Sequence, residues 1–175
     1  MKSDIQKLQN AVRNIPDFPK PGILFRDITP ILNDPELFKI AVNIFANQHK
    51  GVKVDKIAAI EARGFLFAGA VSYKLGAGLV PIRKKGKLPY KTFEESYQLE
   101  YGTAELAVHQ DAFQKGENVI LIDDLLATGG TALAGVHLIE RAGGKVVGID
   151  FLIELTELNG RAKLSGYNVF AAIKF

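Results

Sequence analysis

Five short apolar runs constrain the fold of this chain more than any other feature of its sequence. Each has the length of a buried strand, and helical patterns over 65–76 and 132–143 follow two of them. Strands that alternate with helices predict parallel βαβ units and a sheet covered on both faces. The sequence therefore predicts an α/β fold with a central, mostly parallel sheet flanked by helices. The apolar runs are 56–60, 78–82, 119–123, 145–153 and 167–173.

Other segments predict further local structure. The first residues carry a helical pattern, and the proline-rich stretch 17–22 favours an extended loop. Asp34 followed by Pro35 predicts the start of another helix. Many charges without a period predict an exposed loop over 83–95, and alternation of apolar and polar residues predicts a β-hairpin over 96–110.

Composition limits the class of protein. With 175 residues, 47% of them hydrophobic, the chain is long enough for one well-cored domain, which we expect over 1–175. A net charge of +3, from 22 basic and 19 acidic residues, does not imply a nucleic-acid partner. The absence of cysteine excludes disulfides and thiolate metal sites. Since no stretch resembles a signal peptide or a membrane span, we expect a cytoplasmic protein without a membrane partner.

The string VILIDDLLATGGT, which ends at Thr131, predicts a site for a phosphate and a sugar. Free N–H groups and the helix dipole at a strand-to-helix turn attract an anion, and glycine lets the backbone approach a phosphate closely. Thr128 and Thr131 add hydroxyl donors, while Asp123 and Asp124 are acceptors suited to two ribose hydroxyls. Two acids alone would more often cap a helix, but the whole string favours a 5′-phosphoribosyl site.

A second anion site is predicted beside the first. Ligands of open parallel sheets bind outside the carboxyl ends of the strands, so the ends of 56–60 and 119–123 should share one crevice. Arg63 follows the first of these strands closely, where a second phosphate could bind. The alternative is a surface arginine at a helix start, where the dipole slightly disfavours a cation. A basic cluster nearby in the sequence is either a solvated loop or a further set of diphosphate ligands. Its members are Arg83, Lys84, Lys85 and Lys87.

These strings also carry a family resemblance. VILIDDLLATGGT resembles the phosphoribosyl-diphosphate motif of type I phosphoribosyltransferases, and FPKPGILFRDITPIL (18–32) resembles the N-terminal segment of the adenine phosphoribosyltransferase family. The resemblance continues through IEARGFLFAG, IRKKGKLP, SYQLEYGTAEL and LIELTELNGRAKL, and so covers nearly the whole chain. It implies the type I phosphoribosyltransferase fold, with a small N-terminal hood over about 1–33 and a flexible catalytic loop over about 83–108.

The resemblance further implies which residues bind the substrates. Those for the 5′-phosphate and ribose are Asp123, Asp124, Ala127, Thr128, Gly129, Gly130 and Thr131. Those for pyrophosphate are Ala62, Arg63, Arg83, Lys84 and Lys87, with a non-proline cis peptide expected at Glu61–Ala62 or Ala62–Arg63. Those for adenine are Leu24, Phe25, Arg26, Leu125 and Tyr101. The catalytic residues would be Arg63 and Glu100, the latter placed against the imidazole ring of the base.

The implied reaction converts adenine and 5-phospho-α-D-ribose 1-diphosphate to AMP and pyrophosphate in purine salvage, through an oxocarbenium-like transition state. Mg²⁺ carried by the diphosphate substrate and a homodimer are implied as well. One alternative is a phosphoribosyltransferase for another base, but relatives acting on oxopurines usually carry an acid where this chain has Ala127. The other is a non-enzymatic regulator that senses the diphosphate, for which we see neither a spare domain nor a basic stripe.

Overall fold

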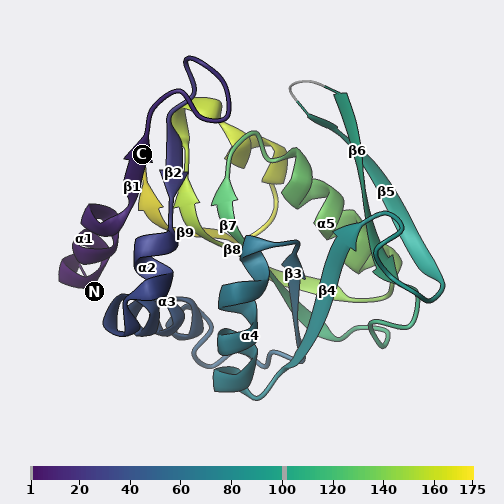
Figure 1. The fold of residues 1–175 in the computed structure, drawn as a ribbon. Helices are drawn as coiled ribbons and strands as arrows, with labels where there is room; N and C mark the ends of the chain where they lie inside the picture. The colour runs from purple at the N-terminus through teal and green to yellow at the C-terminus, as the bar shows by residue number, and fades with distance from the viewer. Residues whose placement is uncertain (1, 100–101) are drawn as a thin grey trace.

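The structure is a computed structural model that describes residues 2–99 and 102–175. Within these residues a seven-stranded sheet has the order β5-β6-β4-β3-β7-β8-β9 (Figure 1). The strands from β4 to β9 in this order run parallel, and β5 and β6 form an antiparallel hairpin beyond β4. The predicted α/β fold with a mostly parallel sheet is therefore confirmed. The strands are β3 (Lys56–Ile60), β4 (Gly78–Lys84), β5 (Thr92–Leu99), β6 (Gly102–His109), β7 (Asn118–Leu126), β8 (Lys145–Glu154) and β9 (Val169–Lys174).

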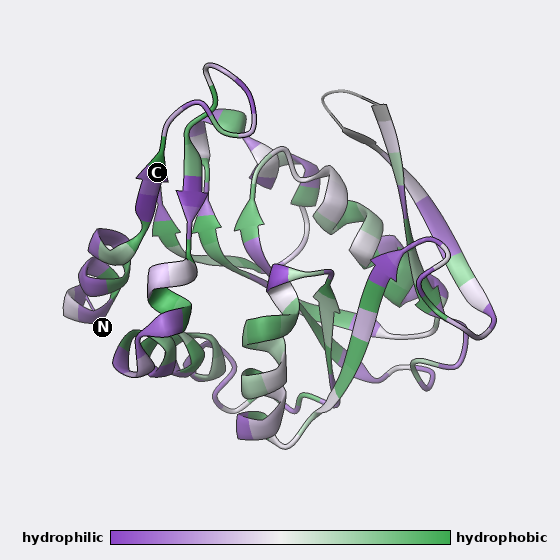
Figure 2. Ribbon diagram, viewed as in Figure 1, coloured by the Kyte–Doolittle hydropathy of each residue, from purple (hydrophilic) through white to green (hydrophobic). Residues whose placement is uncertain are grey.

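Helices cover both faces of this sheet. One face packs against α1 (Lys2–Ala11), α2 (Thr29–Asn33), α3 (Pro35–Gln48) and α4 (Arg63–Leu75), and the other packs against α5 (Gly130–Arg141). Successive residues of β7 contribute alternately to the two cores, as the period of two in a strand requires. The central strands are accordingly mostly apolar, while the helices carry mixed surfaces (Figure 2). No helix of the described chain is long and apolar enough to span a membrane.

The strand order reverses between β3 and β7. The chain leaves β3 through α4 and returns as β4 on one side, whereas β7 leads through α5 to β8 on the other side. Because β3 and β7 pair in parallel, with Ala59 opposite Ile122, their carboxyl ends are neighbours. Ligands of such sheets bind at this switch point. The predicted neighbourhood of the ends of these two strands is thus confirmed.

The N-terminal segment adds structure that we did not predict. β1 (Arg13–Ile15) and β2 (Phe25–Asp27) form a small antiparallel sheet around the proline-rich turn, and α2 follows directly. The carboxylate of Asp27 accepts hydrogen bonds from both the N–H and the hydroxyl of Thr29, at 2.9 and 2.8 Å, which fixes this junction. The predicted start of α3 is confirmed, since the Asp34 side chain accepts from two N–H groups of its first turn at 2.9 Å.

The expected loop over 83–95 is wrong at both ends. β4 continues to Lys84 and β5 begins at Thr92, so the hairpin starts earlier than predicted. Its acids pair with Lys85 in the turn after β4, and the Lys85 ammonium lies 2.8 Å from a Glu94 carboxylate oxygen and 3.4 Å from one of Glu105. Such ion pairs allow a solvated strand to carry many charges, which a search for apolar alternation misses.

Candidate active site

The turn between β7 and α5 has the features of an anion site. We call residues 127–131 the phosphate turn; it follows Leu126, the last residue of β7, and contains the first two residues of α5. None of the backbone hydrogen bonds found in the described turns uses the N–H of Thr128 or Gly129 as donor. No side chain of the described residues caps the start of α5, so its first N–H groups are open to an anion.

Gly129 has a structural reason to be glycine in addition to the predicted close approach of a phosphate. Its φ of +80° lies in the left-handed region, and a Cβ there would lie 2.3 Å from the carbonyl oxygen of Gly160. Gly160 belongs to a short 3₁₀ segment after β8, η2 (Gly160–Leu164). The phosphate turn is therefore packed against a segment about thirty residues away in the sequence, a contact that no local pattern predicts.

The two predicted ribose acids lie within β7 itself, because this strand continues beyond residue 123 to Leu126. Asp123 is half-buried and accepts the N–H of Asp124 at 2.8 Å. Burial, followed by the charge of Asp124, raises the pKa of Asp123 well above its ordinary value. Burial also raises the pKa of Asp124, and the Arg63 guanidinium opposes this rise. Burial thus disfavours the charged forms of both acids, and a ligand that donates hydrogen bonds to them would offset this penalty.

Arg63 joins the end of β3 to the end of β7. Its Nε lies 2.9 Å from Oδ2 of Asp124, whose side chain is 7% exposed. Arg63 is the first residue of α4, and the adjacent Gly64 lets this helix approach β7, since a Cβ there would lie 2.9 Å from the carbonyl oxygen of Ile122. The expected non-proline cis peptide is present between Glu61 and Ala62. The structure thus brings together the predicted pyrophosphate and ribose residues.

Glu61 is a site residue that the sequence analysis missed. Its carboxylate lies 2.7 Å from the Arg83 guanidinium and accepts the backbone N–H of Lys84 at 3.1 Å. The hydrogen bond from Arg83 holds the pKa of Glu61 below its ordinary value. Arg83 also donates to the carbonyl of Lys87 at 3.0 Å. The signal that could have revealed Glu61 was its place immediately after β3, beside a parallel strand whose last two residues are Arg83 and Lys84.

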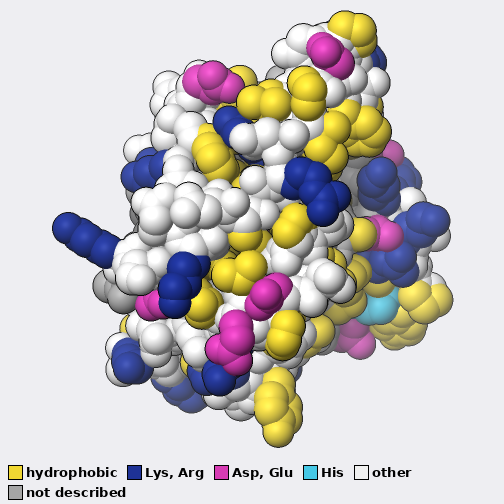
Figure 3. All heavy atoms as spheres, turned by 60° about the vertical axis from the view of Figure 1, so that its left-hand side comes forward, with side chains coloured by type: hydrophobic (Ala, Val, Ile, Leu, Met, Phe, Trp, Pro, Cys, Tyr) yellow, Lys and Arg dark blue, Asp and Glu magenta, His cyan; other side chains and the backbone are white. Residues whose placement is uncertain are grey.

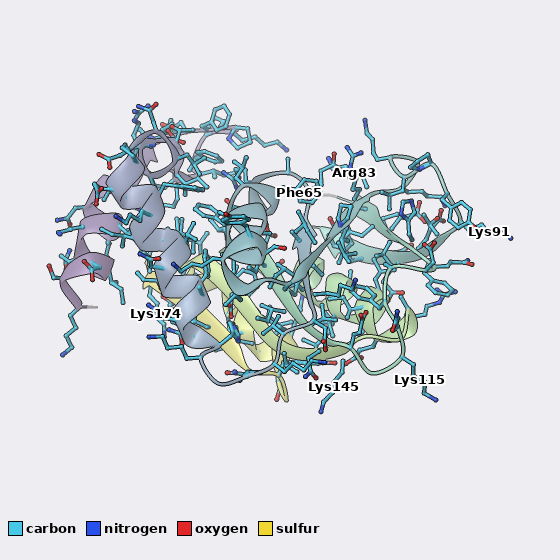
Figure 4. All side chains as sticks on the ribbon, turned by 90° about the horizontal axis from the view of Figure 1, so that it is seen from below. Phe65, Arg83, Lys91, Lys115, Lys145 and Lys174 are labelled. Atoms are coloured by element: carbon cyan, nitrogen blue, oxygen red, sulfur yellow. The ribbon has the colours of Figure 1, made fainter. Side chains whose placement is uncertain are left out.

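The members of the basic cluster therefore have different partners. Arg83 is held beside the end of β3, whereas the side chain of Lys85 is paired with the acids of the hairpin. In the view of Figure 4, Arg83 lies on the same side of the molecule as Phe65 of α4, while Lys115 and Lys145 lie on the opposite side. The predicted pyrophosphate residues Arg83 and Lys84 thus border the same edge of the sheet as Arg63.

The N-terminal segment places one predicted adenine residue beside Arg63. The Arg63 guanidinium carbon lies 5.2 Å from the centroid of the Phe25 ring, which makes an edge-on contact of 5.1 Å with Phe18. Arg26 is turned elsewhere: its guanidinium lies 3.9 Å from the centroid of the Phe175 ring and hydrogen-bonds to Asn14. Of the other predicted adenine residues, Leu24 is exposed and Leu125 is half-buried.

Glu100 and Tyr101 lie outside the described residues, so the structure does not place them. Among the residues it describes, no group of three or more His, Asp or Glu side chains could hold a metal ion. The donor set at the carboxyl edge consists of the acids Asp123 and Asp124 with Arg63 beside them. Such a set fits a metal that is already bound to a diphosphate better than a free one, since Mg²⁺ usually borrows phosphate ligands.

Comparison with known proteins identifies the family. The phosphoribosyl transferase domain family matches residues 28–170. Adenine phosphoribosyltransferase of Methylacidiphilum infernorum is 48% identical over 175 residues, covering 100% of this chain and 98% of that protein. The enzyme of Thermosipho melanesiensis is 56% identical over 169 residues, covering 97% of each.

Solved structures indicate the same family. The crystal structure of adenine phosphoribosyltransferase from Thermoanaerobacter pseudethanolicus has a TM-score of 0.95 and 51% identity, covering 98% of this chain and 99% of that one. The Saccharomyces cerevisiae enzyme, complexed with an imino-altritol bisphosphate and adenine, has a TM-score of 0.94 and 39% identity, with the same coverage. The chain therefore belongs to the type I phosphoribosyltransferases and, within them, to the adenine phosphoribosyltransferase family.

Proposed function

We propose that this protein transfers the 5-phosphoribosyl group of phosphoribosyl diphosphate to adenine, giving AMP and pyrophosphate in purine salvage. The observation that carries the proposal is the contact of 2.9 Å between Arg63 and Asp124, because it joins a cation suited to a diphosphate to an acid suited to ribose at the strand switch point. The yeast relative is complexed with a bisphosphate and adenine, which supports the same pair of ligands here.

In this proposal the phosphate turn binds the 5′-phosphate. The N–H groups of residues 127–131 and the hydroxyls of Thr128 and Thr131 donate to its oxygens, and the start of α5 favours its charge. Asp123 and Asp124 accept hydrogen bonds from the two ribose hydroxyls. Hydrogen bonds to the charged form favour ionisation, so the ribose offsets part of the cost of burying these acids.

The pyrophosphate group binds across the ends of β3 and β4. Arg63, Arg83, Lys84 and Lys87 supply positive charge, and the backbone at Ala62 supplies donors. Stabilising the charge that develops on the departing diphosphate is the largest contribution to catalysis that these residues offer. Mg²⁺, carried in by the diphosphate, supplies further charge neutralisation when bound. The cations of the chain align the diphosphate for departure from the anomeric carbon.

Adenine lies between the phosphate turn and the hood of residues 1–33. Phe25 and Leu125 form apolar walls, with Leu24 and Tyr101 nearby. Arg26 would contribute through its backbone, because its side chain is turned to Phe175 and Asn14. Glu100 faces the imidazole ring of the base, where it hydrogen-bonds to the ring or accepts the proton that the ring loses as N9 bonds to the anomeric carbon and the diphosphate departs. The loop of residues 83–108 closes over the site and excludes water from the reactive sugar. We assign all of these parts to one domain, 1–175, in the cytoplasm.

We also propose that the protein acts as a homodimer, with helices α3 and α4 at the interface. Tyr73 of α4 is 91% exposed and Leu66 of the same helix is 49% exposed. A largely apolar groove, which includes Phe38, Val42 and Ala70, runs between the two helices. Figure 3 shows hydrophobic side chains exposed among charged ones on the face that carries the N-terminal helices. Light scattering of the parent and of Tyr73→Glu tests this part, and a dimer is expected only for the parent.

The activity itself is tested by identifying products. The protein is incubated with phosphoribosyl diphosphate, Mg²⁺ and a panel of bases, and AMP is expected from adenine with little product from hypoxanthine or guanine. A site built around the 6-amino edge leaves buried acceptors unpaired against a 6-oxo group, which can discriminate by about 10⁴-fold. Comparable rates with hypoxanthine would contradict the proposal.

A further inference from the structure

The segment LIELTELNGRAKL (152–164) has been assigned no function, although it begins with the last three residues of β8 and runs directly past the phosphate turn. The N–H of Leu155 donates to the carbonyl of Leu126 at 2.9 Å, which ties the start of this segment to the last residue of β7. Leu164, at its other end, is buried in the core beneath α5. The segment is therefore fixed at both ends, and Gly160 lies between them.

Gly160 contacts the phosphate turn by its backbone. A Cβ at this position would lie 2.1 Å from the carbonyl oxygen of Ala127 and 2.8 Å from the amide nitrogen of Gly129. A Cβ on Gly129 would in turn meet the carbonyl oxygen of Gly160. The two glycines thus allow two backbones to touch where neither could carry a side chain. Any shift of Gly160 would be transmitted to the carbonyl and amide groups of the turn.

The next residue, Arg161, holds Gly160 in place through three hydrogen bonds. Its Nε and Nη2 donate to the two carboxylate oxygens of Glu154 at 2.9 and 2.6 Å, and its Nη1 donates to the carbonyl of Val169 at 2.7 Å. The Glu154 side chain is 7% exposed, and its residue pairs with Leu126 in the sheet register. Arg161 and Glu154, which we call the clamp, are therefore anchored to β8 and β9, two strands of the central sheet.

We propose that Arg161 and Glu154 are positioning residues for the reaction: through Gly160 they set the geometry of the phosphate turn and thereby the affinity for the 5′-phosphate group. This inference rests on the proposed function, since it takes the turn to be the 5′-phosphate site. Neither side chain has been assigned a contact with substrate. A lysine at 161 could not replace the arginine, because one ammonium cannot make the bidentate contact and also reach Val169.

The affinity ratio between AMP and adenosine isolates this effect, because the two ligands differ only in the 5′-phosphate. We would measure both dissociation constants by calorimetry for the parent, Arg161→Lys, Glu154→Gln and a control, Asp55→Asn. Asp55 pairs with Lys53 at 2.7 Å and accepts the N–H of Asn118 at 2.9 Å, so the control loosens the opposite end of β7. Melting temperatures are recorded for all four proteins.

The parent should prefer AMP strongly. Arg161→Lys and Glu154→Gln should reduce the AMP-to-adenosine preference by about 10-fold or more, since small displacements of a binding group can cost up to about 100-fold. Adenosine affinity should change little, and Asp55→Asn should keep the parent's ratio even if its melting temperature falls. Two substitutions are used so that a failure of one to fold leaves the other to decide.

The possible results distinguish a failure of the proposed function from a failure of the positioning role. A parent without preference for AMP would show that the phosphate turn does not bind the 5′-phosphate, and the proposed function of the turn would fail. A parent that prefers AMP, with folded clamp variants that keep its ratio, would overturn the positioning role and leave the proposed function intact. Loss of the ratio in Asp55→Asn as well would also overturn it, because general loosening would then explain the effect.

Discussion

Replacing Gly129 by alanine should destabilise the protein and weaken its binding of phosphoribosyl diphosphate. The residue has a φ of +80°, where a non-glycine residue costs about 1 kcal/mol. The new methyl group would lie 2.3 Å from the carbonyl oxygen of Gly160, which is far inside van der Waals contact. Relieving such a clash typically costs about 1–3 kcal/mol. A total of about 3 kcal/mol corresponds to a fall in melting temperature of about 6–12 °C for a chain of this size.

Gly51→Ala is the matched control for this experiment. Gly51 has a φ of +82°, but a Cβ there would meet no atom within 4 Å. The control should therefore lose only the backbone contribution of about 1 kcal/mol, or about 2–4 °C. Steady-state kinetics should show a raised KM for phosphoribosyl diphosphate in Gly129→Ala alone. Equal losses of melting temperature in the two variants would refute the energetic importance of the Gly129–Gly160 contact, and an unchanged KM would refute the function assigned to the turn.

Three further predictions concern charged residues of the site. Burial and the charge of Asp124 raise the pKa of Asp123 in the folded protein above its value of 3.8 in the unfolded chain. Ionisation of Asp123 therefore lowers the free energy of unfolding at pH values above about 4. Asp123→Asn should thus melt higher than the parent at pH 7, with the gain vanishing as the pH falls to about 4, while KM for the diphosphate rises; a gain independent of pH would contradict this. Arg83→Met, which removes the partner of Glu61, should raise the same KM without changing adenine binding, and an unchanged KM would return Arg83 to a structural function. Glu100→Leu should lower kcat by about 10²–10⁴-fold, and retention of activity in Glu100→Gln would show hydrogen-bond donation rather than proton transfer.

The sequence predicted those parts of the fold in which local pattern and tertiary burial agree. The run 56–60 coincides with β3 because its residues are covered on both faces and leave no polar alternation to misread. Asp34 and Pro35 mark the start of α3 because capping is a local interaction. The short strands β1 and β2 were missed because three residues carry too little pattern, and they are stabilised by pairing with each other.

The candidate site was predictable where one string carries several of its groups, and not where a contact joins distant segments. Asp123 and Asp124 could be assigned from their own neighbourhood. Glu61 could not be paired with Arg83 from the sequence, because the pairing depends on the register that sets Ile60 opposite Ile82 in the parallel strands. The contact of Gly160 with the phosphate turn depends likewise on where β8 ends relative to β7.

The charge pairs of the site suggest how one substrate engages both of its halves. Arg63 is paired with Asp124 and Arg83 with Glu61, while the two arginine side chains remain 39% and 32% exposed. Pairs that reach solvent are weak, whereas bidentate contacts of arginine with phosphate are strong. A bound diphosphate can therefore replace Asp124 and Glu61 as the partner of Arg63 and Arg83. Asp124 would then be left as a buried carboxylate without its cation, unless the ribose of the same substrate donates hydroxyl groups to it. Because one molecule supplies both replacements, we expect the diphosphate and the ribose to bind cooperatively, and pyrophosphate alone to bind much more weakly than its share of the contacts would indicate.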